Sequence, residues 1–222
     1  LSIRFQDYRP AIPKGITGGQ KLITLLTSLT MTANYRCGGD FDKLTIPFRT
    51  VSTDVVSGEL IVIDSGSIAD AMRATIAFPL AFTGFESDGR LLMDGGMLMP
   101  IPVSIARSIA DSLAILVAIN TASPLQSLSE LQTPVHIASQ VSTIMTADKM
   151  AAQLKEAEIV VTPPIESYGS TDFDQMDSLL TIGYREGLKA ADSILRLIDK
   201  KTALSTATFN RVSCNMPEFD SL

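Results

Sequence analysis

An aspartate followed by two glycines, Asp94-Gly95-Gly96, is the clearest candidate for chemistry in this sequence. The apolar run "RLLM" precedes it and "MLMPIPVSIAR" follows it, so the pattern predicts a turn after a strand. Glycine adopts backbone angles that other residues avoid, which lets the chain turn sharply there. At the carboxyl edge of an open α/β sheet, where ligands bind, such a carboxylate can lie in a crevice and orient a partner. The spacing alone also fits an ordinary turn between a strand and a helix.

The other candidate residues show weaker patterns. The one histidine, His136, lies in the apolar helical stretch "TPVHIASQV", where we expect a structural role. Cys37 and Cys214 are far apart in the sequence and are expected to be two unpaired thiols. Asp88 and Asp94 lie six residues apart without a third ligand beside them, so we expect no metal and no other cofactor.

Composition and charge limit the classes of protein that fit. The chain has 222 residues, enough for one sizeable α/β domain. It carries 24 acidic and 18 basic residues, a formal net charge of −6, and it has no cluster of Lys and Arg. Nucleic-acid binding is therefore not expected. No apolar run reaches the roughly 18 residues that a membrane-spanning helix requires.

The spacing of apolar residues predicts strands that alternate with helices. Strands are expected at 46–55, 58–64, 90–94, 112–120 and 159–162, and helices at 20–31, 67–78, 102–110, 127–157 and 172–201. This alternation predicts an α/β fold with a largely parallel central sheet. The continuous apolar run at 112–120 is typical of a parallel strand covered on both faces. The stretch "TATFNRVSC", residues 206–214, is expected to be β-like.

Four stretches resemble, in order, the patatin-like phospholipase family. "IPKGITGGQKL" is similar to that family's LPKGL-x-x-GQ stretch, and "FDKLTIPFRTVSTDVVSGE" to its FDxLPIPFRAVATDxxTGE. "MRATIAFPLAF" is similar to xRASxAxPGxF, and Asp94-Gly95-Gly96 with "PIPVSIAR" to the catalytic Asp-Gly-Gly/Ala turn and the helix start after it. The resemblance extends from about residue 10 to about residue 200.

The resemblance implies a modified α/β-hydrolase fold of three layers with a largely parallel sheet. It also implies a Ser-Asp dyad, in which Asp94 is the acidic partner and Gly95 and Gly96 form the turn of the motif. The activity implied is hydrolysis of lipid esters, of the phospholipase A or esterase type, as in bacterial NTE-type esterases. The implied partner is a phospholipid or another lipid ester, with peripheral membrane contact left open and no nucleic acid.

Three positions depart from the family pattern. Thr75 and Leu80 stand where the family usually has serine and glycine, and Met99 stands where many members carry asparagine or aspartate. These positions shape the turn near Asp94. We therefore expect them to bear on the fit of the substrate more than on the type of reaction.

The serine half of the dyad has no match in the sequence. No serine lies in the elbow pattern G-x-S-x-G, and the nearest string to an oxyanion loop is "CGGD" at 37–40. In the family both elements precede the LPKGL stretch. We therefore expect residues 1–201 to be the C-terminal portion of the catalytic domain, inactive by itself, with the N-terminal part missing.

Residues 202–222 are expected to form a linker or the start of a following domain. A non-catalytic patatin-like domain that binds lipid or a membrane surface is the alternative function. The sequence does not determine the location, which is left open between the bacterial cytoplasm and the cell envelope. An outer-membrane barrel downstream, as in some Gram-negative relatives, is also left open.

Overall fold

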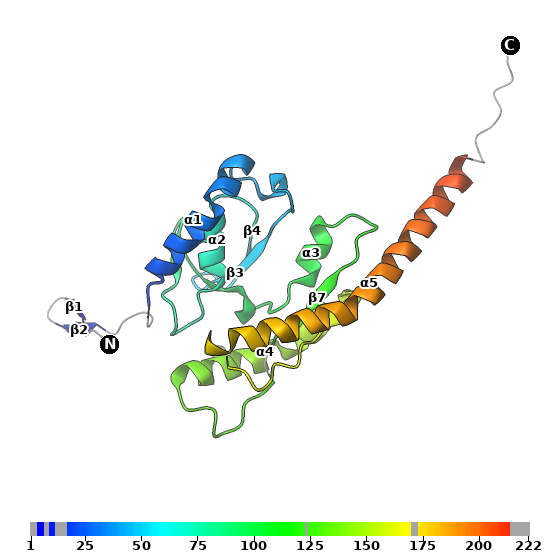
Figure 1. The fold of residues 1–222 in the computed structure, drawn as a ribbon. Coiled ribbons are helices and arrows are strands. Elements are labelled where there is room, and N and C mark those ends of the chain that lie inside the picture. The colour runs from blue at the N-terminus through cyan, green and yellow to red at the C-terminus, as the bar shows by residue number, and fades with distance from the viewer. Residues whose placement is uncertain (1–3, 7–8, 12–16, 123, 170–172, 214–222) are drawn as a thin grey trace, which may run out of the picture. The chain divides into compact units, whose positions relative to one another are not determined.

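The computed structural model describes residues 4–6, 9–11, 17–122, 124–169 and 173–213 (Figure 1). The chain forms two compact units, one of Leu1–Pro102 with Pro124–Ala152 and one of Val103–Ser123 with Gln153–Leu222. Asp94 belongs to the first unit. Each unit contains a β-sheet of its own.

The main sheet of the first unit is antiparallel throughout. Its four strands are β3 (Thr50–Asp54), β4 (Leu60–Ile63), β5 (Phe85–Ser87) and β6 (Arg90–Asp94), in the order β4-β3-β6-β5. Each of the three neighbouring pairs is antiparallel. A separate antiparallel pair joins β1 (Arg4–Gln6) and β2 (Arg9–Ala11). The mixed α/β class is confirmed, whereas the expected largely parallel sheet is wrong.

Two short connections explain why β5 pairs with β6, and β3 with β4, in antiparallel direction. Asp88 and Gly89 alone join β5 to β6, with φ angles of 50° and 75°. Two central residues with positive φ form the type of turn that matches the twist of a hairpin. Residues 55–59 join β3 to β4, and Gly58 has a φ of 77°. Loops this short can connect only antiparallel strands, because parallel strands require a long crossover.

Helical segments accompany this sheet, and α2 (Ile68–Thr75) packs directly against β3 and β6. The other helical segments are α1 (Gln20–Cys37), η1 (Phe41–Lys43), η2 (Gly95–Met97) and α4 (Pro134–Glu156), which extends into residues of the second unit. The Ser67 side chain accepts a hydrogen bond from the Asp70 N–H at 3.2 Å and so caps the start of α2.

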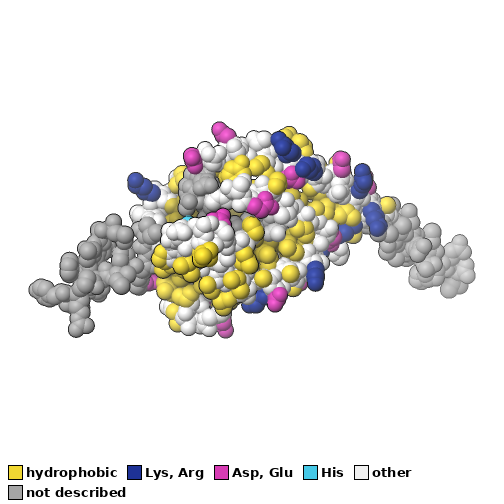
Figure 2. Space-filling view, turned by 90° about the horizontal axis from the view of Figure 1, so that it is seen from below, with side chains coloured by type: hydrophobic (Ala, Val, Ile, Leu, Met, Phe, Trp, Pro, Cys, Tyr) yellow, Lys and Arg dark blue, Asp and Glu magenta, His cyan; other side chains and the backbone are white. Residues whose placement is uncertain are grey.

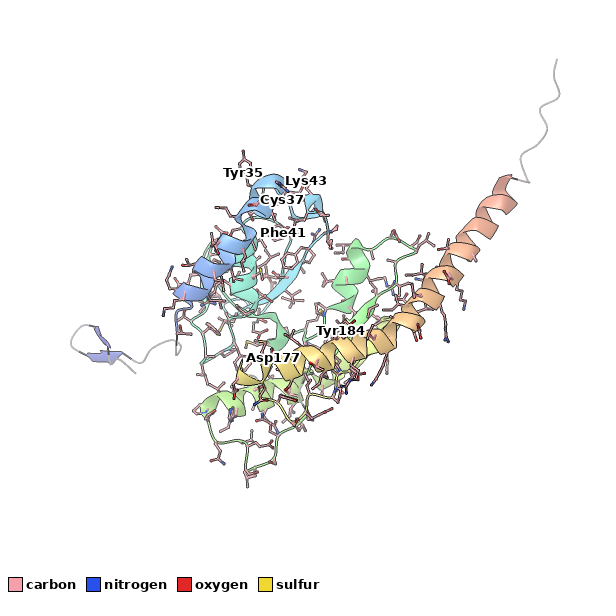
Figure 3. The ribbon with its side chains drawn as sticks, viewed as in Figure 1. Tyr35, Cys37, Phe41, Lys43, Asp177 and Tyr184 are labelled. Atoms are coloured by element: carbon pink, nitrogen blue, oxygen red, sulfur yellow. The ribbon has the colours of Figure 1, made fainter. Side chains whose placement is uncertain are left out.

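The hydrophobic core is centred on Phe41, which is fully buried at the start of η1 (Figure 3). Phe41 packs with Ile68 and Ala71 of α2, and Ile63 of β4 lies against the same cluster. The rings of Phe41 and Phe48 are 5.8 Å apart and tilted by 43°. These contacts hold α2 against one face of the sheet.

A buried arginine ties the segment before α1 to the loop after α2. The Arg73 guanidinium donates to the carbonyl oxygens of Gly18 at 3.2 Å and Thr83 at 2.7 Å. It also lies over the ring of Phe82, 5.3 Å from the centroid. Burial lowers the pKa of Arg73. The planar guanidinium can bind two carbonyl groups at once, which a lysine ammonium does less well.

The second unit contains α3 (Val103–Ile109), β7 (Val117–Ile119), β8 (Ile159–Val161), η3 (Phe173–Gln175) and α5 (Met176–Ser213). The strands β7 and β8 pair in parallel, as expected for the run at 112–120. The strand covers only three residues, and Val117 and Ile119 are 38% and 62% exposed, so burial on both faces was wrongly expected.

The helix α5 is longer than the sequence pattern indicates. It continues through Ser213, so the β-like run expected at 206–214 is wrong over the part that the structure describes. Several of its apolar side chains are exposed, among them Leu180, Tyr184 and Leu188, and hydrophobic side chains are prominent on the surface in Figure 2. None of the described helices combines the length and hydropathy needed to cross a bilayer.

The turn after α2 holds a leucine in a conformation that favours glycine. Leu80 has a φ of 68°, in the left-handed region, where a Cβ atom crowds the backbone. This backbone angle explains why the resembling family pattern has glycine at this position.

We predict that Leu80→Gly stabilises the chain by about 0.5–1 kcal/mol, since relief of the left-handed strain outweighs the added entropy of the unfolded state. Equilibrium unfolding in urea measures the change. Leu80→Ala is the control, because it removes the same side chain but keeps the strain. A gain for alanine equal to that for glycine would contradict the explanation.

Candidate active site

Asp94 is the last residue of β6, an inner strand of the four-stranded sheet. Its backbone N–H donates to the Ala77 carbonyl at 3.1 Å, just beyond the end of α2. The Thr53 hydroxyl donates to the Asp94 carbonyl at 3.0 Å. The expected strand ending at this aspartate is therefore confirmed, and both sides of its peptide backbone are held.

The Asp94 carboxylate is half-buried and accepts one hydrogen bond from the residues that the structure describes. Its Oδ1 accepts from the Gly96 N–H at 2.7 Å, which caps the short helix η2. Among the described residues, Oδ2 has no partner. Burial raises the pKa of Asp94 above its ordinary value, and the Gly96 hydrogen bond opposes part of that rise. A carboxyl group whose pKa is raised in this way takes up a proton more readily than an ordinary aspartate.

Gly95 is required by a close approach of two backbones. A Cβ atom at this position would lie 2.3 Å from the Val51 carbonyl oxygen and 2.6 Å from its carbonyl carbon. Only glycine allows η2 to start directly against β3. Gly96 has a different role, because a Cβ there would lie 3.0 Å from Oδ1 of Asp94 and would crowd the carboxylate itself.

The same carbonyl of Val51 receives a hydrogen bond from α2. The Thr75 hydroxyl donates to it at 2.6 Å. Thr75 stands where the family pattern has serine, and both residues offer the hydroxyl that this contact requires. Thr75 therefore supplies a hydrogen bond between α2 and β3 at the carbonyl group that Gly95 approaches.

Asp54, on the same sheet, has a contrasting environment. Its carboxylate accepts from the Val56 N–H at 3.0 Å, the Ser57 hydroxyl at 2.9 Å and the Leu91 N–H at 3.3 Å. The bond from Val56 lowers the pKa of Asp54 most, Ser57 and Leu91 add to this, and burial acts in the opposite direction. Because these three hydrogen bonds tie its carboxylate to the hairpin and to β6, Asp54 is a structural carboxylate.

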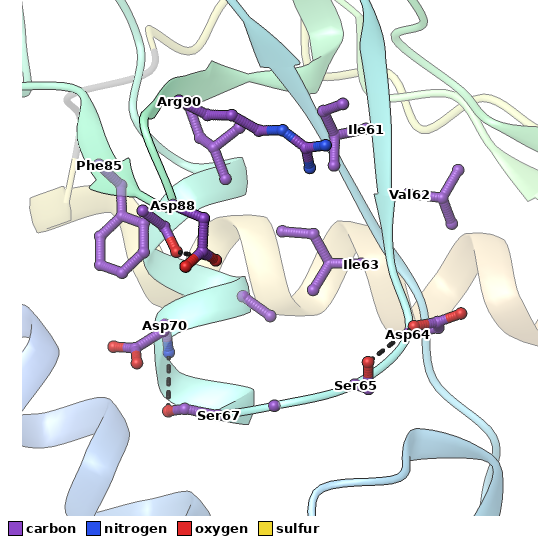
Figure 4. A pocket seen from close by; sticks show the side chains of 14 residues that line it. Ile61, Val62, Ile63, Asp64, Ser65, Ser67, Asp70, Phe85, Asp88 and Arg90 are labelled. Atoms are coloured by element: carbon purple, nitrogen blue, oxygen red, sulfur yellow. Dashed lines mark hydrogen bonds between the residues drawn. The ribbon is translucent and has the colours of Figure 1, made fainter.

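A hollow of about 360 Å³ lies over the sheet, near the beginning of β6 (Figure 4). Ile61 and Ile63 of β4, Phe85 of β5, and the charged residues Asp88 and Arg90 at the β5–β6 turn are among the residues that line it. Asp94 is not one of them. The described residues contain no group of three or more His, Cys, Asp or Glu side chains arranged to bind a metal ion.

The weaker candidates lie in local structure. The His136 ring is bound at Nδ1 to the Glu130 carbonyl at 2.8 Å, at the start of α4. Cys37 is a buried free thiol at the end of α1, whereas Cys214 lies outside the described residues. In "CGGD", Gly38 ends α1 with a φ of 62°, so this string is a helix terminus.

Two contributions to the site had no signal in the sequence. Ser52 is fully buried on β3 in the position directly opposite Asp94. The hydrogen bond from Thr75 to Val51 joins residues 24 positions apart. Alternation along the strand indicates which residues share a face, but it does not identify the neighbouring strand.

A carboxylate with a raised pKa at the end of an inner strand, on a tight glycine turn, defines a protein with a candidate acid–base site on an α/β scaffold. Comparison with known proteins narrows this class. Residues 11–107 match the patatin-like phospholipase family, a range that includes the whole sheet and Asp94. This part of the chain is similar to that family.

Individual relatives show the same similarity. An uncharacterized NTE family protein of Mycobacterium tuberculosis is 38% identical over 79 residues, 36% of this chain and 22% of the relative. A second one from that organism is 25% identical over 174 residues, 67% of this chain and 30% of the relative. The mouse patatin-like phospholipase domain-containing protein 7 is 23% identical over 207 residues, 79% of this chain. The chain spans only 15% to 30% of the lengths of these relatives.

We predict that Gly95→Ala destabilises the chain by about 2 kcal/mol or more, because the new methyl group meets backbone that cannot move freely. Gly18→Ala is the matched control, since a Cβ there would have nothing within 4 Å. Urea unfolding of both variants gives the comparison. Equal stability of the two variants would show that η2 does not depend on this contact.

The lowered pKa of Asp54 predicts a pH dependence of stability. Its folded-state pKa is below the ordinary value of 3.8, so its contribution is fully present above that value and is lost as pH falls through the folded pKa. Asp54→Asn should lower the urea midpoint at pH 7 and weaken the fall in stability in acid. Glu59→Gln, an exposed change in the same hairpin, serves as control. An unchanged acid profile in Asp54→Asn would contradict this role.

Proposed function

We propose that this chain contributes the acidic half of a Ser-Asp dyad in a lipid acyl hydrolase, and that Asp94 is the residue that accepts the serine proton. The observation that carries the proposal is the geometry of its carboxylate at the end of β6. One oxygen is held by the Gly96 N–H, and the other has no partner among the described residues. The second oxygen is therefore available to a hydroxyl group.

The chemistry follows from this arrangement. The free carboxylate oxygen accepts the proton of the serine hydroxyl as that oxygen attacks the ester carbonyl. An acyl-serine ester forms, and the alcohol leaves with the proton. Water then attacks the acyl-serine, again with Asp94 as proton acceptor, and releases the fatty acid. The raised pKa of Asp94 brings it closer to the working pH, which favours both directions of proton transfer.

The serine and the oxyanion donors are proposed to come from sequence that precedes this chain in the complete protein. This rests on the lack of any G-x-S-x-G pattern within the 222 residues and on the much greater length of the relatives. The proposed substrate is a phospholipid or a related lipid ester, the class that the family description names.

Asp94→Asn tests the dyad in the complete protein. The amide keeps the shape of the carboxylate but cannot accept the proton, so kcat for a chromogenic ester should fall by about 10²–10⁴-fold. Asp88→Asn is the matched control, because Asp88 lies in an exposed turn with a φ of 50° that asparagine also adopts. Circular dichroism verifies the fold of both variants.

Two outcomes would contradict the proposal. Near-normal turnover by Asp94→Asn would exclude Asp94 as proton acceptor. Covalent labelling of the 222-residue chain by a fluorophosphonate probe would place a reactive serine within it. Absence of hydrolysis and of labelling in the complete protein would favour the alternative, a lipid-binding domain without catalysis.

A further inference from the structure

A buried serine hydroxyl without a partner lies beside the candidate catalytic carboxylate. Ser52 is fully buried on β3, and its Oγ has no hydrogen-bond partner in the part of the chain that the structure describes. A hydroxyl that is removed from water and left unpaired costs free energy, so such groups are rare. Its presence in the centre of the sheet therefore requires an explanation.

The register of the sheet places Ser52 directly opposite Asp94. Residues that face each other across two antiparallel strands project their side chains on the same face, with Cβ atoms about 4.5–5.5 Å apart. At that separation, rotation of one side chain between staggered conformations can bring a serine hydroxyl to a carboxylate oxygen. Ser52 and Asp94 therefore offer one unpaired donor and one unpaired acceptor to each other.

We propose that Ser52 is a positioning residue for Asp94, whose hydroxyl donates a hydrogen bond to the Oδ2 oxygen of the ionised carboxylate. With Gly96 on Oδ1 and Ser52 on Oδ2, the carboxylate is held at both oxygens and still has lone pairs for an incoming hydroxyl. The consequence for catalysis rests on the proposed function of Asp94, whereas the hydrogen bond itself does not.

No charged side chain competes for this role among the described residues. The shift in the pKa of Asp94 arises only from burial and from the Gly96 N–H. Asp54 is bound to its own hairpin, and Arg73 is directed to Gly18 and Thr83. The remaining charged residues of the neighbouring elements are Asp70 of α2, Glu86 of β5 and Arg90 of β6, and none of them contributes to the shift.

The test measures the pKa of Asp94 in the chain by NMR of ¹³C-labelled aspartate carboxyl carbons. The Asp94 signal is the one that disappears in Asp94→Asn. Loss of a donor to the ionised form should raise the pKa of Asp94 by about one unit in Ser52→Ala. Ser52→Thr keeps the hydroxyl on a residue suited to a strand and should restore the value of the unmodified chain.

Two further variants make the result specific. Thr53→Val removes the hydroxyl that binds the Asp94 carbonyl, not its carboxylate, and should leave the pKa unchanged. Ser52→Cys provides a weaker donor and should give an intermediate value, which also covers the case that the alanine variant folds poorly. The family pattern has alanine at position 52, so the fold is expected to tolerate Ser52→Ala.

An unchanged pKa of Asp94 in Ser52→Ala would overturn the proposal, and so would equal rises in the alanine and threonine variants, since packing would then be the cause. Because the titration requires no turnover, it can fail while Asp94 remains the proton acceptor. It can also succeed when the ester assay of Asp94→Asn contradicts the dyad.

Discussion

The contact between Gly95 and the Val51 peptide is the constraint on which the candidate site depends. At this point the chain leaves β6 and crosses the end of β3 at a distance that excludes any side chain. The Val51 carbonyl also receives the Thr75 hydroxyl, so β3, α2 and η2 meet at one peptide group. The position and direction of Asp94, which precedes Gly95, follow from this junction.

Two aspartates on this sheet show how the surroundings separate a structural from a reactive carboxyl group. Asp54 has three donors, so its pKa is lowered and its charge is permanent at neutral pH. Asp94 is half-buried and accepts one hydrogen bond from the described residues, so its pKa is raised. Opposite shifts in neighbouring acids are typical of sites in which one group exchanges protons and the other maintains the scaffold.

The region that matches the patatin-like family coincides with the part of the chain that builds this junction. Residues 11–107 contain the Arg73 contacts to Gly18 and Thr83, the four-stranded sheet and the Asp94 turn. The matched motifs thus correspond to specific contacts rather than to general α/β architecture. Leu80 is an example, because its positive φ is a conformation that glycine adopts freely and leucine adopts only with strain.

The sequence by itself determined the local features. Helix caps such as Ser67, the Asp88-Gly89 hairpin and the turn after Asp94 depend on residues within a few positions of each other, so their patterns are readable. Only the tertiary structure decided which strands pair and in which direction. The antiparallel order, the approach of Gly95 to Val51 and the alignment of Ser52 with Asp94 join residues about 40 positions apart. No local periodicity encodes such pairings, because they arise from packing of the whole sheet against α2.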